Sequence, residues 1–487
     1  MNRLRTLTTD GPSGTVQSYI FTPRPGGHRE KIEEHDGTIR EYAYDDLYRL
    51  TNENVTSTAG LVYDKVFDYD SVGNRNVQAT TGLGARVVNY TYDERDRLLT
   101  ENGTVYGWDD NGNLTSKSGE ATYFWDFENR LVRVEKADGT VVTHAYDADG
   151  NRFRTEVTPA TGPPTVTDFL VDPSGFLSHV VAETDDTGNV IGHYVRGVDD
   201  LLSVIRPTET RYYHADGLGS IRFLTDESGN ITDTYQYTAF GELLAHAGSE
   251  PQPYTFAGEP YDPNIGFYYN RARWLAPTIG RFASVDPWAG FIYDPVTLHK
   301  YVYAWADPVN TVDPDGLEPL PATIAALQIR VSLAVSTLGV RLVAAFAAGG
   351  PVIGRLFNAI GRFAQTAAHE VLVFYQSIRP GFEILAQRQT GARVIDFFVR
   401  FGNRAAWIEV KYALPWRAGE PLTRLVGQVQ AAAAAAEGQV VLWTLRPPSV
   451  GQVKLVLDHL GQSAARVQFV HGIEGLYRWL LFYFGGV

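Results

Sequence analysis

The sequence YDDLYRL, from Tyr44 to Leu50, shows the pattern that decides the fold of this 487-residue chain. An aromatic residue and an aspartate precede a short turn-forming run, which ends in an apolar or β-prone residue. Such a unit predicts a strand, a tight turn and a second strand. Similar units follow at intervals of 25, 23, 16, 17 and 21 residues. They are YDSVGNR from Tyr69, YDERDRL from Tyr92, WDDNGNL from Trp108, WDFENRL from Trp125 and YDADGNR from Tyr146.

The recurrence of these units predicts a scaffold of stacked β elements over residues 40–172. A single unit of this size cannot bury its own apolar face, so each unit has to pack against its neighbours. We therefore expect the aromatic residues that begin the units to pack in the core. The alternative, a flat aromatic platform for a sugar or a base, is less favoured.

Composition indicates a globular protein of two or three domains, since 44% of the residues are hydrophobic and 20% are charged. Cysteine is absent, which excludes disulfides and cysteine-ligated zinc. The first residues, MNRLRTLTTDGPSG, lack the apolar segment of a cleaved signal peptide. Because the chain starts in mid-pattern, we expect either a truncated reading frame or export that needs no cleaved signal.

Charge is distributed unevenly along the chain. The overall net charge is −14, yet residues 318–487 contain 14 Arg and 2 Lys against 9 Asp and Glu, a net charge of +7. The preceding 317 residues carry 26 basic and 47 acidic side chains. A basic part that is rich in arginine is typical of nucleic-acid binding, because arginine makes bidentate contacts to phosphate.

The apolar stretch over residues 320–360 is interrupted by Arg330, Arg341 and Arg355 and by Gly349-Gly350-Pro351. Its uninterrupted runs are too short for a transmembrane helix, so a core or amphipathic helix pair is expected and stable membrane insertion is not.

Two apolar runs near the C-terminus carry a pattern of acidic residues and a lysine. RVIDFFVR, from Arg393 to Arg400, predicts a strand that includes Asp396, and AAWIEVKY predicts a second strand with Glu409 and Lys411. Residues two apart on a strand share a face, and a hairpin partner can bring Asp396 beside them. Two carboxylates on a half-buried sheet favour a divalent cation. An ordinary cross-strand ion pair is the alternative.

Further along the scaffold the sequence contains three denser blocks, and these carry a family resemblance. The six units resemble the YD repeats of the Rhs family, and the blocks resemble its repeat-associated core, over roughly residues 40–317. The resemblance implies a β-cage that carries a variable C-terminal toxin. The blocks are YYHADGLGSIRFLTDESGNITDTYQYTAFGE from Tyr212, FAGEPYDPNIGFYYNRARWLAPTIGRFASVDPWAG from Phe256 and YVYAWADPVNTVDPDGL from Tyr301.

The end of the last block, PVNTVDPDGL, matches the P-x4-DPxGL boundary of the same family. The resemblance implies self-cleavage between Leu317 and Glu318 by a pair of aspartates. The candidates are Asp286 and Asp313, with Arg273 as the supporting cation. Two adjacent carboxylates share a proton, so that one can activate water while the other polarises the carbonyl. Asp307 and Asp315 are alternatives for the second carboxylate.

The C-terminal pattern resembles the PD-(D/E)XK nucleases, with Asp396, Glu409 and Lys411 in the positions of the signature. The resemblance implies Mg²⁺ or Mn²⁺ held by Asp396, Glu409 and the Val410 carbonyl, while Lys411 positions or activates water. Glu370 is either a further ligand or a solvated helix residue. The predicted order is a helix over 362–376, strands near 382–386, 393–400 and 405–412, a helix over 420–437, a strand from 439 and a helix over 450–460.

Overall, the sequence predicts a multidomain protein, a β-rich YD-repeat scaffold followed by an α/β restriction-endonuclease-like domain. The expected domains are a scaffold (1–200), a repeat-associated core with the self-cleavage boundary (201–317), an apolar helical segment (318–361) and a nuclease-like toxin domain (362–487).

The expected function is that of an exported Rhs-type toxin that hydrolyses DNA in the cytoplasm of a target cell. Its expected partners are DNA, a cognate immunity protein and secretion machinery. Two alternatives stay open: a non-enzymatic surface or adhesion protein built from YD repeats, and a membrane-disrupting toxin acting through residues 320–360.

Overall fold

A computed structural model of the chain describes residues 4–11, 14–173, 177–197, 200–290, 295–317 and 319–321, together with the strand segments 383–386, 389–390, 393–394, 397–401, 404–411, 439–444 and 467–471. The chain divides into two compact units, residues 3–323 and residues 324–487 together with 1–2.

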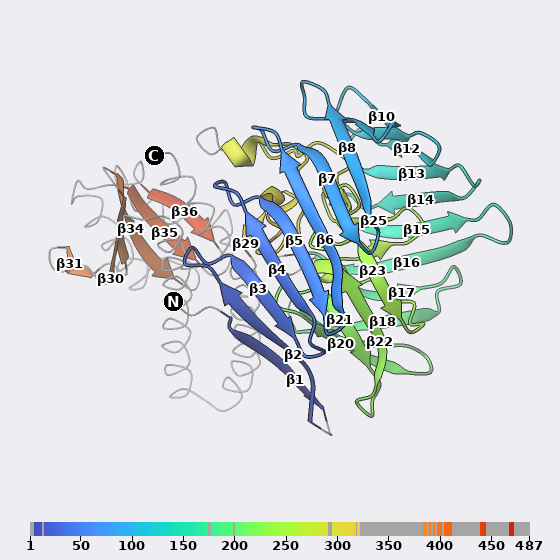
Figure 1. The fold of residues 1–487 in the computed structure, drawn as a ribbon, viewed down its shortest axis with the longest axis horizontal. Coiled ribbons are helices and arrows are strands. Elements are labelled where there is room, and N and C mark those ends of the chain that lie inside the picture. Colours follow the sequence, from blue (N-terminus) through green and yellow to red (C-terminus); the bar gives the residue numbers. More distant parts are fainter. Residues whose placement is uncertain are drawn as a thin grey trace, which may run out of the picture. The chain divides into compact units, whose positions relative to one another are not determined.

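The first unit is built on an antiparallel sheet of 23 strands, in which each strand pairs with the strands before and after it in the chain. Tight turns impose this order, because a tight turn can join only neighbouring strands. The strand direction changes strongly between β4–β7 and β12–β16, as expected of a twisted sheet (Figure 1).

The strands of this sheet have the following bounds: β1 (Thr6–Gly11), β2 (Gly14–Pro23), β3 (Arg29–Glu34), β4 (Ile39–Tyr44), β5 (Leu50–Ser57), β6 (Gly60–Tyr69), β7 (Arg75–Gly82), β8 (Arg86–Tyr92), β9 (Leu98–Glu101), β10 (Thr104–Trp108), β11 (Leu114–Lys117), β12 (Ala121–Trp125), β13 (Leu131–Lys136), β14 (Val141–Tyr146), β15 (Arg152–Thr158), β16 (Thr165–Asp172), β17 (His179–Thr184), β18 (Val190–Gly197), β19 (Asp200–Ile205), β20 (Thr210–Ala215), β21 (Ile221–Thr225), β22 (Ile231–Tyr237) and β23 (Leu243–Ala247).

Each repeat turn is closed by its aspartate. Asp45 Oδ1 accepts the N–H of Arg49 at 2.9 Å, and Asp70 Oδ1 accepts the N–H of Asn74 at 2.8 Å. The side chain four residues after the aspartate then binds the second oxygen, as Arg49 Nε does at 2.6 Å and Asn74 Nδ2 at 3.0 Å. Arginine and asparagine alternate at this position through the six repeats, in the order Arg49, Asn74, Arg97, Asn113, Arg130 and Asn151.

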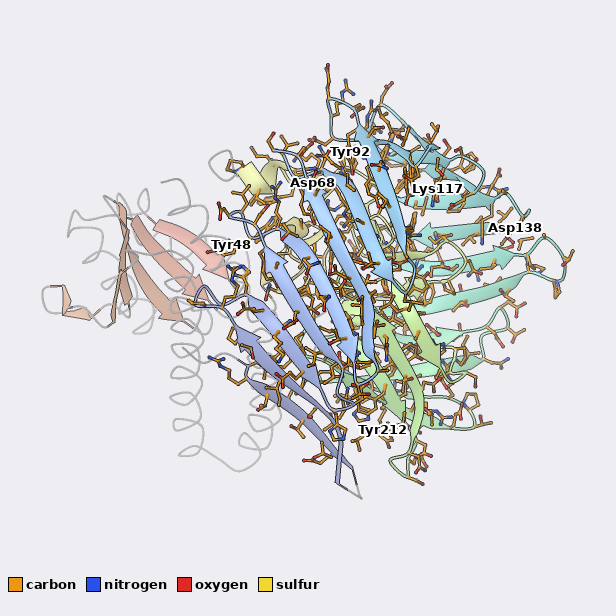
Figure 2. All side chains as sticks on the ribbon, viewed as in Figure 1. Tyr48, Asp68, Tyr92, Lys117, Asp138 and Tyr212 are labelled. Carbon is orange, nitrogen blue, oxygen red and sulfur yellow. The ribbon has the colours of Figure 1, made fainter. Side chains whose placement is uncertain are left out.

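Each repeat aromatic stands at the end of its strand, where the register is irregular, as Tyr92 does at the end of β8 (Figure 2). Its side chain also forms a hydrogen bond with the preceding repeat. Its polar hydrogen points to the carbonyl that follows the preceding turn. Tyr and Trp serve equally because both carry one donor at the far end of an apolar ring. These bonds are Tyr69 Oη to Leu50 O (2.9 Å), Tyr92 Oη to Arg75 O (2.8 Å), Trp108 Nε1 to Leu98 O (2.7 Å), Trp125 Nε1 to Leu114 O (2.6 Å) and Tyr146 Oη to Leu131 O (2.9 Å).

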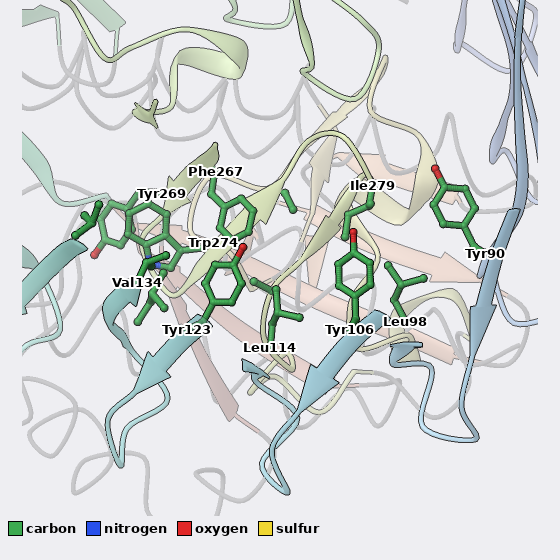
Figure 3. Close-up of a cluster of buried hydrophobic side chains, with 14 of the residues drawn as sticks. Tyr90, Leu98, Tyr106, Leu114, Tyr123, Val134, Phe267, Tyr269, Trp274 and Ile279 are labelled. Carbon is green, nitrogen blue, oxygen red and sulfur yellow. The ribbon is translucent and has the colours of Figure 1, made fainter. Parts of the chain in front are cut away.

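The core of the first unit lies between one face of the sheet and residues 254–309. Side chains of β10–β12 meet those of the later segment, with the rings of Tyr123 and Phe267 stacked at 5.7 Å (Figure 3). The predicted packing of the repeat aromatics is confirmed, since Tyr92, Trp108, Trp125 and Tyr146 all pack against this cluster.

Buried and partly buried ion pairs connect the first strands of the sheet with the last ones. Glu34 on β3 binds Arg40 and also Arg222 on β21, each at 2.7 Å. Lys65 on β6 binds Glu242 at 2.9 Å. These pairs close the curved sheet around its core through side chains.

The segment after β23 consists of short elements that the sheet surrounds. They are η1 (Phe256–Gly258), β24 (Tyr261–Asp262), β25 (Phe267–Asn270), β26 (Arg273–Ala276), β27 (Arg281–Phe282), η2 (Pro295–Leu298), η3 (Tyr303–Ala306), β28 (Thr311–Val312) and β29 (Leu320–Pro321).

In the second unit the described strands form a mixed sheet in the order β30-β33-β34-β35-β36. β33 is antiparallel to β30 and β34, whereas β34–β35 and β35–β36 are parallel. A separate two-residue pair consists of β31 and β32. The bounds are β30 (Glu383–Ala386), β31 (Gln389–Thr390), β32 (Arg393–Val394), β33 (Phe397–Phe401), β34 (Arg404–Lys411), β35 (Gln439–Thr444) and β36 (Val467–His471).

The run from Arg393 to Arg400, predicted as one strand, contains β32, which pairs with β31, and β33, which pairs with β30 and β34. Ile395 and Asp396, between β32 and β33, lie outside the described residues. The pairs Ala386–Phe397 and Gln389–Val394 have the same register. The helices expected over 362–376, 420–437 and 450–460 lie outside the described residues. Within the described part of the chain, no helix has the length and apolarity needed to span a membrane.

Candidate active site

The candidate site is built on the β25–β26 hairpin. Tyr268 and Tyr269 before the turn and Trp274 and Leu275 after it are all buried, so packing fixes both arms of the hairpin. The turn that joins them, residues 270–273, faces the loop that contains the expected cleavage boundary. We call residues 270–273 the hairpin turn and residues 313–317 the boundary loop.

Arg273 lies at the centre of the site and is only 2% exposed. Its Nη2 atom contacts Asp286 Oδ2 at 2.9 Å and Asp313 Oδ2 at 3.1 Å. The same nitrogen donates to the carbonyl oxygen of Leu317 at 3.4 Å. One guanidinium nitrogen therefore joins both candidate carboxylates to the carbonyl of the expected cleavage bond.

Both main-chain polar groups of Leu317, its N–H and its C=O, face this cluster. The N–H of Leu317 donates to Asp313 Oδ1 at 3.0 Å and to Asp315 Oδ1 at 3.1 Å. Gly316 has φ = 71° and no room for a side chain, because an added Cβ would lie 2.3 Å from the Asn270 carbonyl oxygen. The loop thus needs glycine at this position for its conformation and for close approach to the hairpin turn.

Strands hold the chain on both sides of the boundary. Thr311 and Val312 of β28 pair with Pro321 and Leu320 of β29. Glu318, the expected residue after the cut, lies outside the described residues. The antiparallel pairing keeps the boundary loop in place by main-chain bonds before and after it.

Burial determines the protonation of the two candidate carboxylates. Asp313 has no exposed surface, and desolvation raises its pKa well above the usual range. Arg273 opposes this shift, while the charges of Asp315 and Asp286 add to it. At Asp313, burial and the two acidic neighbours thus outweigh the one arginine that faces the carboxyl.

The environment of Asp286 favours its anion more. Desolvation raises its pKa as well, but Arg273, the N–H of Trp288 and the Lys300 ammonium all lower it. The N–H of Trp288 donates to Asp286 Oδ1 at 2.8 Å, and the Lys300 carbonyl accepts the N–H of Asp286 at 3.0 Å. Of the two candidate carboxylates, Asp286 thus has the more cationic surroundings and Asp313 the more deeply buried ones.

Asp307, an alternative for the second carboxylate, belongs to a different contact. Its Oδ2 atom lies 3.3 Å from His28 Nε2, and its Oδ1 accepts a bond from Asn310 Nδ2 at 2.7 Å. Burial raises the pKa of Asp307 to about 7. Asp315, the other alternative, belongs to the boundary loop itself, where it accepts the N–H of Leu317 and helps to raise the pKa of Asp313.

The sequence analysis missed three residues of this site. Asn270 and Arg271 bind the boundary loop, and Lys300 supports Asp286. For Arg271 the sequence did contain a signal, because in RARW this residue precedes the candidate Arg273 by two positions. Lys300 is 27 residues from Arg273 and gave no signal, because its role depends on the tertiary fold.

The candidate residues of the nuclease lie in the second unit. For some of these residues the structure describes the backbone alone. Glu409, Val410 and Lys411 belong to β34, and Phe397, which follows Asp396 in sequence, pairs with Ile408, which precedes Glu409. Asp396 and Glu370 themselves lie outside the described residues. Among the residues that the structure does describe, no group of three or more potential ligands gathers into a metal site.

Comparison with known proteins places these observations in a family context. The teneurin YD-shell family model matches residues 29–309. The chain is 34% identical over 280 residues to the tRNA3(Ser)-specific nuclease WapA of Bacillus spizizenii, covering 56% of this chain and 12% of that protein. It is 28% identical over 336 residues to the double-stranded DNA deaminase toxin A of Burkholderia cenocepacia, covering 64% and 21% of the two chains.

A shorter similarity, 32% identity over 122 residues, relates the chain to the toxin protein Tse5 of Pseudomonas aeruginosa. Among solved structures, that of TcdB2-TccC3-Cdc42 is similar with a TM-score of 0.33 and 18% identity, covering 64% of this chain and 20% of that one. The chain spans between about a tenth and a fifth of the length of these three curated relatives.

Proposed function

The chain belongs to the teneurin YD-shell family, and we propose that it is the carrier and toxin part of a polymorphic toxin that cuts itself after Leu317 and thereby frees a metal-dependent nuclease. The main support for self-cleavage is the Arg273 guanidinium, which contacts Asp286, Asp313 and the Leu317 carbonyl through one nitrogen. The main support for a toxin is the similarity to a tRNA nuclease, a DNA deaminase toxin and Tse5.

In the proposed cleavage, Asp286 removes a proton from a water molecule that attacks the Leu317 carbonyl carbon. Arg273 and the protonated Asp313 stabilise the negative charge that develops on the carbonyl oxygen. The bond from this carbon to the Glu318 nitrogen then breaks, and that nitrogen takes up a proton from the carboxyl pair. The products are a Leu317 carboxylate and a Glu318 amine, so the water molecule is divided between the two new chain ends.

For the released part we propose the D…ExK chemistry of the restriction-endonuclease-like fold. The described strands support it, because an antiparallel β33–β34 pair continues into the parallel strands β35 and β36. Asp396, Glu409 and the Val410 carbonyl are a hard oxygen donor set that suits Mg²⁺ or Mn²⁺. When bound, the ion would stabilise charge at the phosphodiester, and Lys411 would position the attacking water.

We further propose that DNA is the substrate, that the chain is exported through secretion machinery, and that a cognate immunity protein protects the producing cell. The toxin part would then act in the cytoplasm of the target cell. A tRNA substrate is a second candidate, since the relative from Bacillus spizizenii carries that activity in its name.

A cleavage assay with two substrates tests the nuclease. The self-processed full chain is incubated with supercoiled plasmid DNA and, separately, with total tRNA, in Mg²⁺ and in EDTA. We expect the plasmid to be cut in Mg²⁺ only. Degradation of tRNA alone would move the substrate to RNA, and activity that persists in EDTA would exclude the metal mechanism.

Two substitutions separate metal binding from chemistry. Glu409→Gln removes a ligand charge, so we expect weaker Mg²⁺ binding and loss of cutting. Lys411→Ala should retain Mg²⁺ binding, measured by calorimetry, and lose cutting as well. DNA binding should survive in both variants and weaken with salt. Glu437→Gln, which changes the same charge elsewhere in this part of the sequence, serves as the control and should cut normally.

A further inference from the structure

The hairpin turn binds the boundary loop through every carbonyl of the loop. Four consecutive residues provide the donors, and five consecutive residues provide the acceptors. The contacts are Asn270 Nδ2 to Asp313 O (2.6 Å), Arg271 Nη1 to Pro314 O, Ala272 N to Asp315 O (3.1 Å), Arg273 Nε to Gly316 O and Arg273 Nη2 to Leu317 O (3.4 Å).

These hydrogen bonds go to the main chain of the loop and not to its side chains. Carbonyl oxygens are present in every sequence, so they carry no information about residue type, but their spacing fixes the register of the segment. Two side-chain requirements remain. Gly316 has no room for a Cβ, and the Asp313 carboxylate belongs to the proposed reaction.

Arg271 is fixed more firmly than a surface arginine at a turn. Its backbone has φ = 55°, a left-handed conformation that is uncommon for a residue with a side chain. Its Nη1 atom also binds Glu259 at 2.8 Å, and its Nε donates to the Ser178 carbonyl at 3.1 Å. Glu259 is only 6% exposed. Its buried carboxylate and the Ser178 carbonyl therefore fix the position of the guanidinium independently of the boundary loop.

We infer that the hairpin turn is a main-chain recognition site that sets which peptide bond faces the Asp286–Asp313 pair, and that Arg271 is its positioning residue. The inference rests on the proposed self-cleavage, and it adds what determines the peptide bond that is cut. The recognised class is a five-residue turn with glycine in the fourth position, whatever sequence follows Leu317. Arg271 acts by holding the Pro314 carbonyl, three residues before the bond that is cut.

The test compares Arg271→Gln and Arg271→Lys with Arg206→Gln. Arg206 is a matched control, because it also pairs with a buried glutamate, Glu250, and binds main-chain carbonyls, but it is not among the residues that contact the boundary loop. The rate of self-cleavage is followed on gels, and the mass of the N-terminal fragment identifies the bond that was cut. The wild-type fragment should end only at Leu317.

For Arg271→Gln we expect cleavage at least about 10-fold slower and fragments with more than one C-terminal residue, because a small displacement from the reactive geometry is costly. Arg271→Lys should recover part of the rate, since the ammonium can still reach Glu259. Arg206→Gln should cut only after Leu317, within about 2-fold of the wild-type rate. A wild-type rate and a single Leu317 end in Arg271→Gln would overturn the inference.

A second measurement judges the inference without relying on self-cleavage. In an Asp286→Asn background, added protease probes the boundary loop of the intact chain. Arg271→Gln should make residues 313–321 much more susceptible, whereas Arg206→Gln should leave them protected. Equal susceptibility in the two variants would overturn the inference. A wild-type chain that never cuts itself would remove the proposed function, while this protection would still show whether the hairpin turn holds the loop.

Discussion

The turn between β17 and β18 and the boundary loop share a side-chain hydrogen bond and a left-handed glycine, but they use them for different purposes. In Asp185-Asp186-Thr187-Gly188-Asn189 and in Asp313-Pro314-Asp315-Gly316-Leu317, the first carboxylate accepts the N–H of the fifth residue, at 2.9 and 3.0 Å, and the glycine before that residue is left-handed. The main-chain bonds differ, because the Asp185 carbonyl accepts the N–H of Gly188 at 3.0 Å, whereas the Asp313 carbonyl accepts Asn270 Nδ2 of the hairpin turn.

The surroundings of the aspartate distinguish the two turns. Hydrogen bonds from Asn189 and Thr187 lower the pKa of the exposed Asp185 to about 2, so that this carboxylate is a fixed anion that closes a turn. At Asp313 burial raises the pKa, and Arg273 replaces the local asparagine as the partner of the second oxygen. A turn that is structural at the surface becomes suited to proton transfer when it is buried beside a second carboxylate.

Glycine substitutions give the largest expected difference between the two turns. Gly150 in a repeat turn and Gly316 in the boundary loop both have positive φ, 84° and 71°. Only Gly316 lacks space for a Cβ, since no atom lies within 4 Å of the position at Gly150. Gly316→Ala should slow self-cleavage by about 100-fold through a displaced loop.

The matched variant Gly150→Ala should cut at the wild-type rate and lose about 1 kcal/mol of stability from its left-handed backbone. Cleavage time courses and urea unfolding measure the two effects. If both glycine variants cut normally, the close approach of the boundary loop to the hairpin turn is not needed for the reaction.

Asp307 gives a smaller effect, in the dependence of stability on pH. Its folded-state pKa of about 7 lies above the unfolded value, so the stability that the buried carboxyl contributes is complete below the unfolded pKa and is lost as the pH rises through 7. Urea unfolding in an Asp286→Asn background should therefore show the chain losing about 3 kcal/mol more than the Asp307→Asn variant between pH 5 and pH 9.

Asp226→Asn is the control for this measurement, because the pKa of Asp226 is shifted in the opposite direction from that of Asp307. The pKa of the exposed Asp226 carboxylate is lowered, mainly by its bond with Asn230, so it contributes stability that is lost on the acid side. The Asp226→Asn variant should thus follow the parent from pH 5 to pH 9. A parent whose stability between these pH values matches that of Asp307→Asn would contradict the pKa assigned to Asp307.

The sequence predicted the repeat scaffold well because its signal is local. The aromatic, the aspartate and the turn residues of one unit lie within seven positions, and they define strand ends that pair with their neighbours in the chain. Arg273, Asp286 and Asp313 were named by their motifs, and the fold brings all three into contact.

The support around this cluster could not be predicted from the sequence. Lys300 acts on Asp286 through packing of distant segments, and Asp307 pairs with His28 from the opposite end of the unit. Such contacts leave no periodic pattern in the sequence.

Intact-mass measurement of the purified chain tests the central claim most directly. The wild-type chain should yield two fragments divided between Leu317 and Glu318, Asp286→Asn should stay whole, and Asp226→Asn, which alters only a surface turn, should divide like the wild type. An Asp286→Asn chain that still divides after Leu317 would contradict the roles given to Arg273 and the two carboxylates, and an undivided wild-type chain would contradict self-cleavage itself.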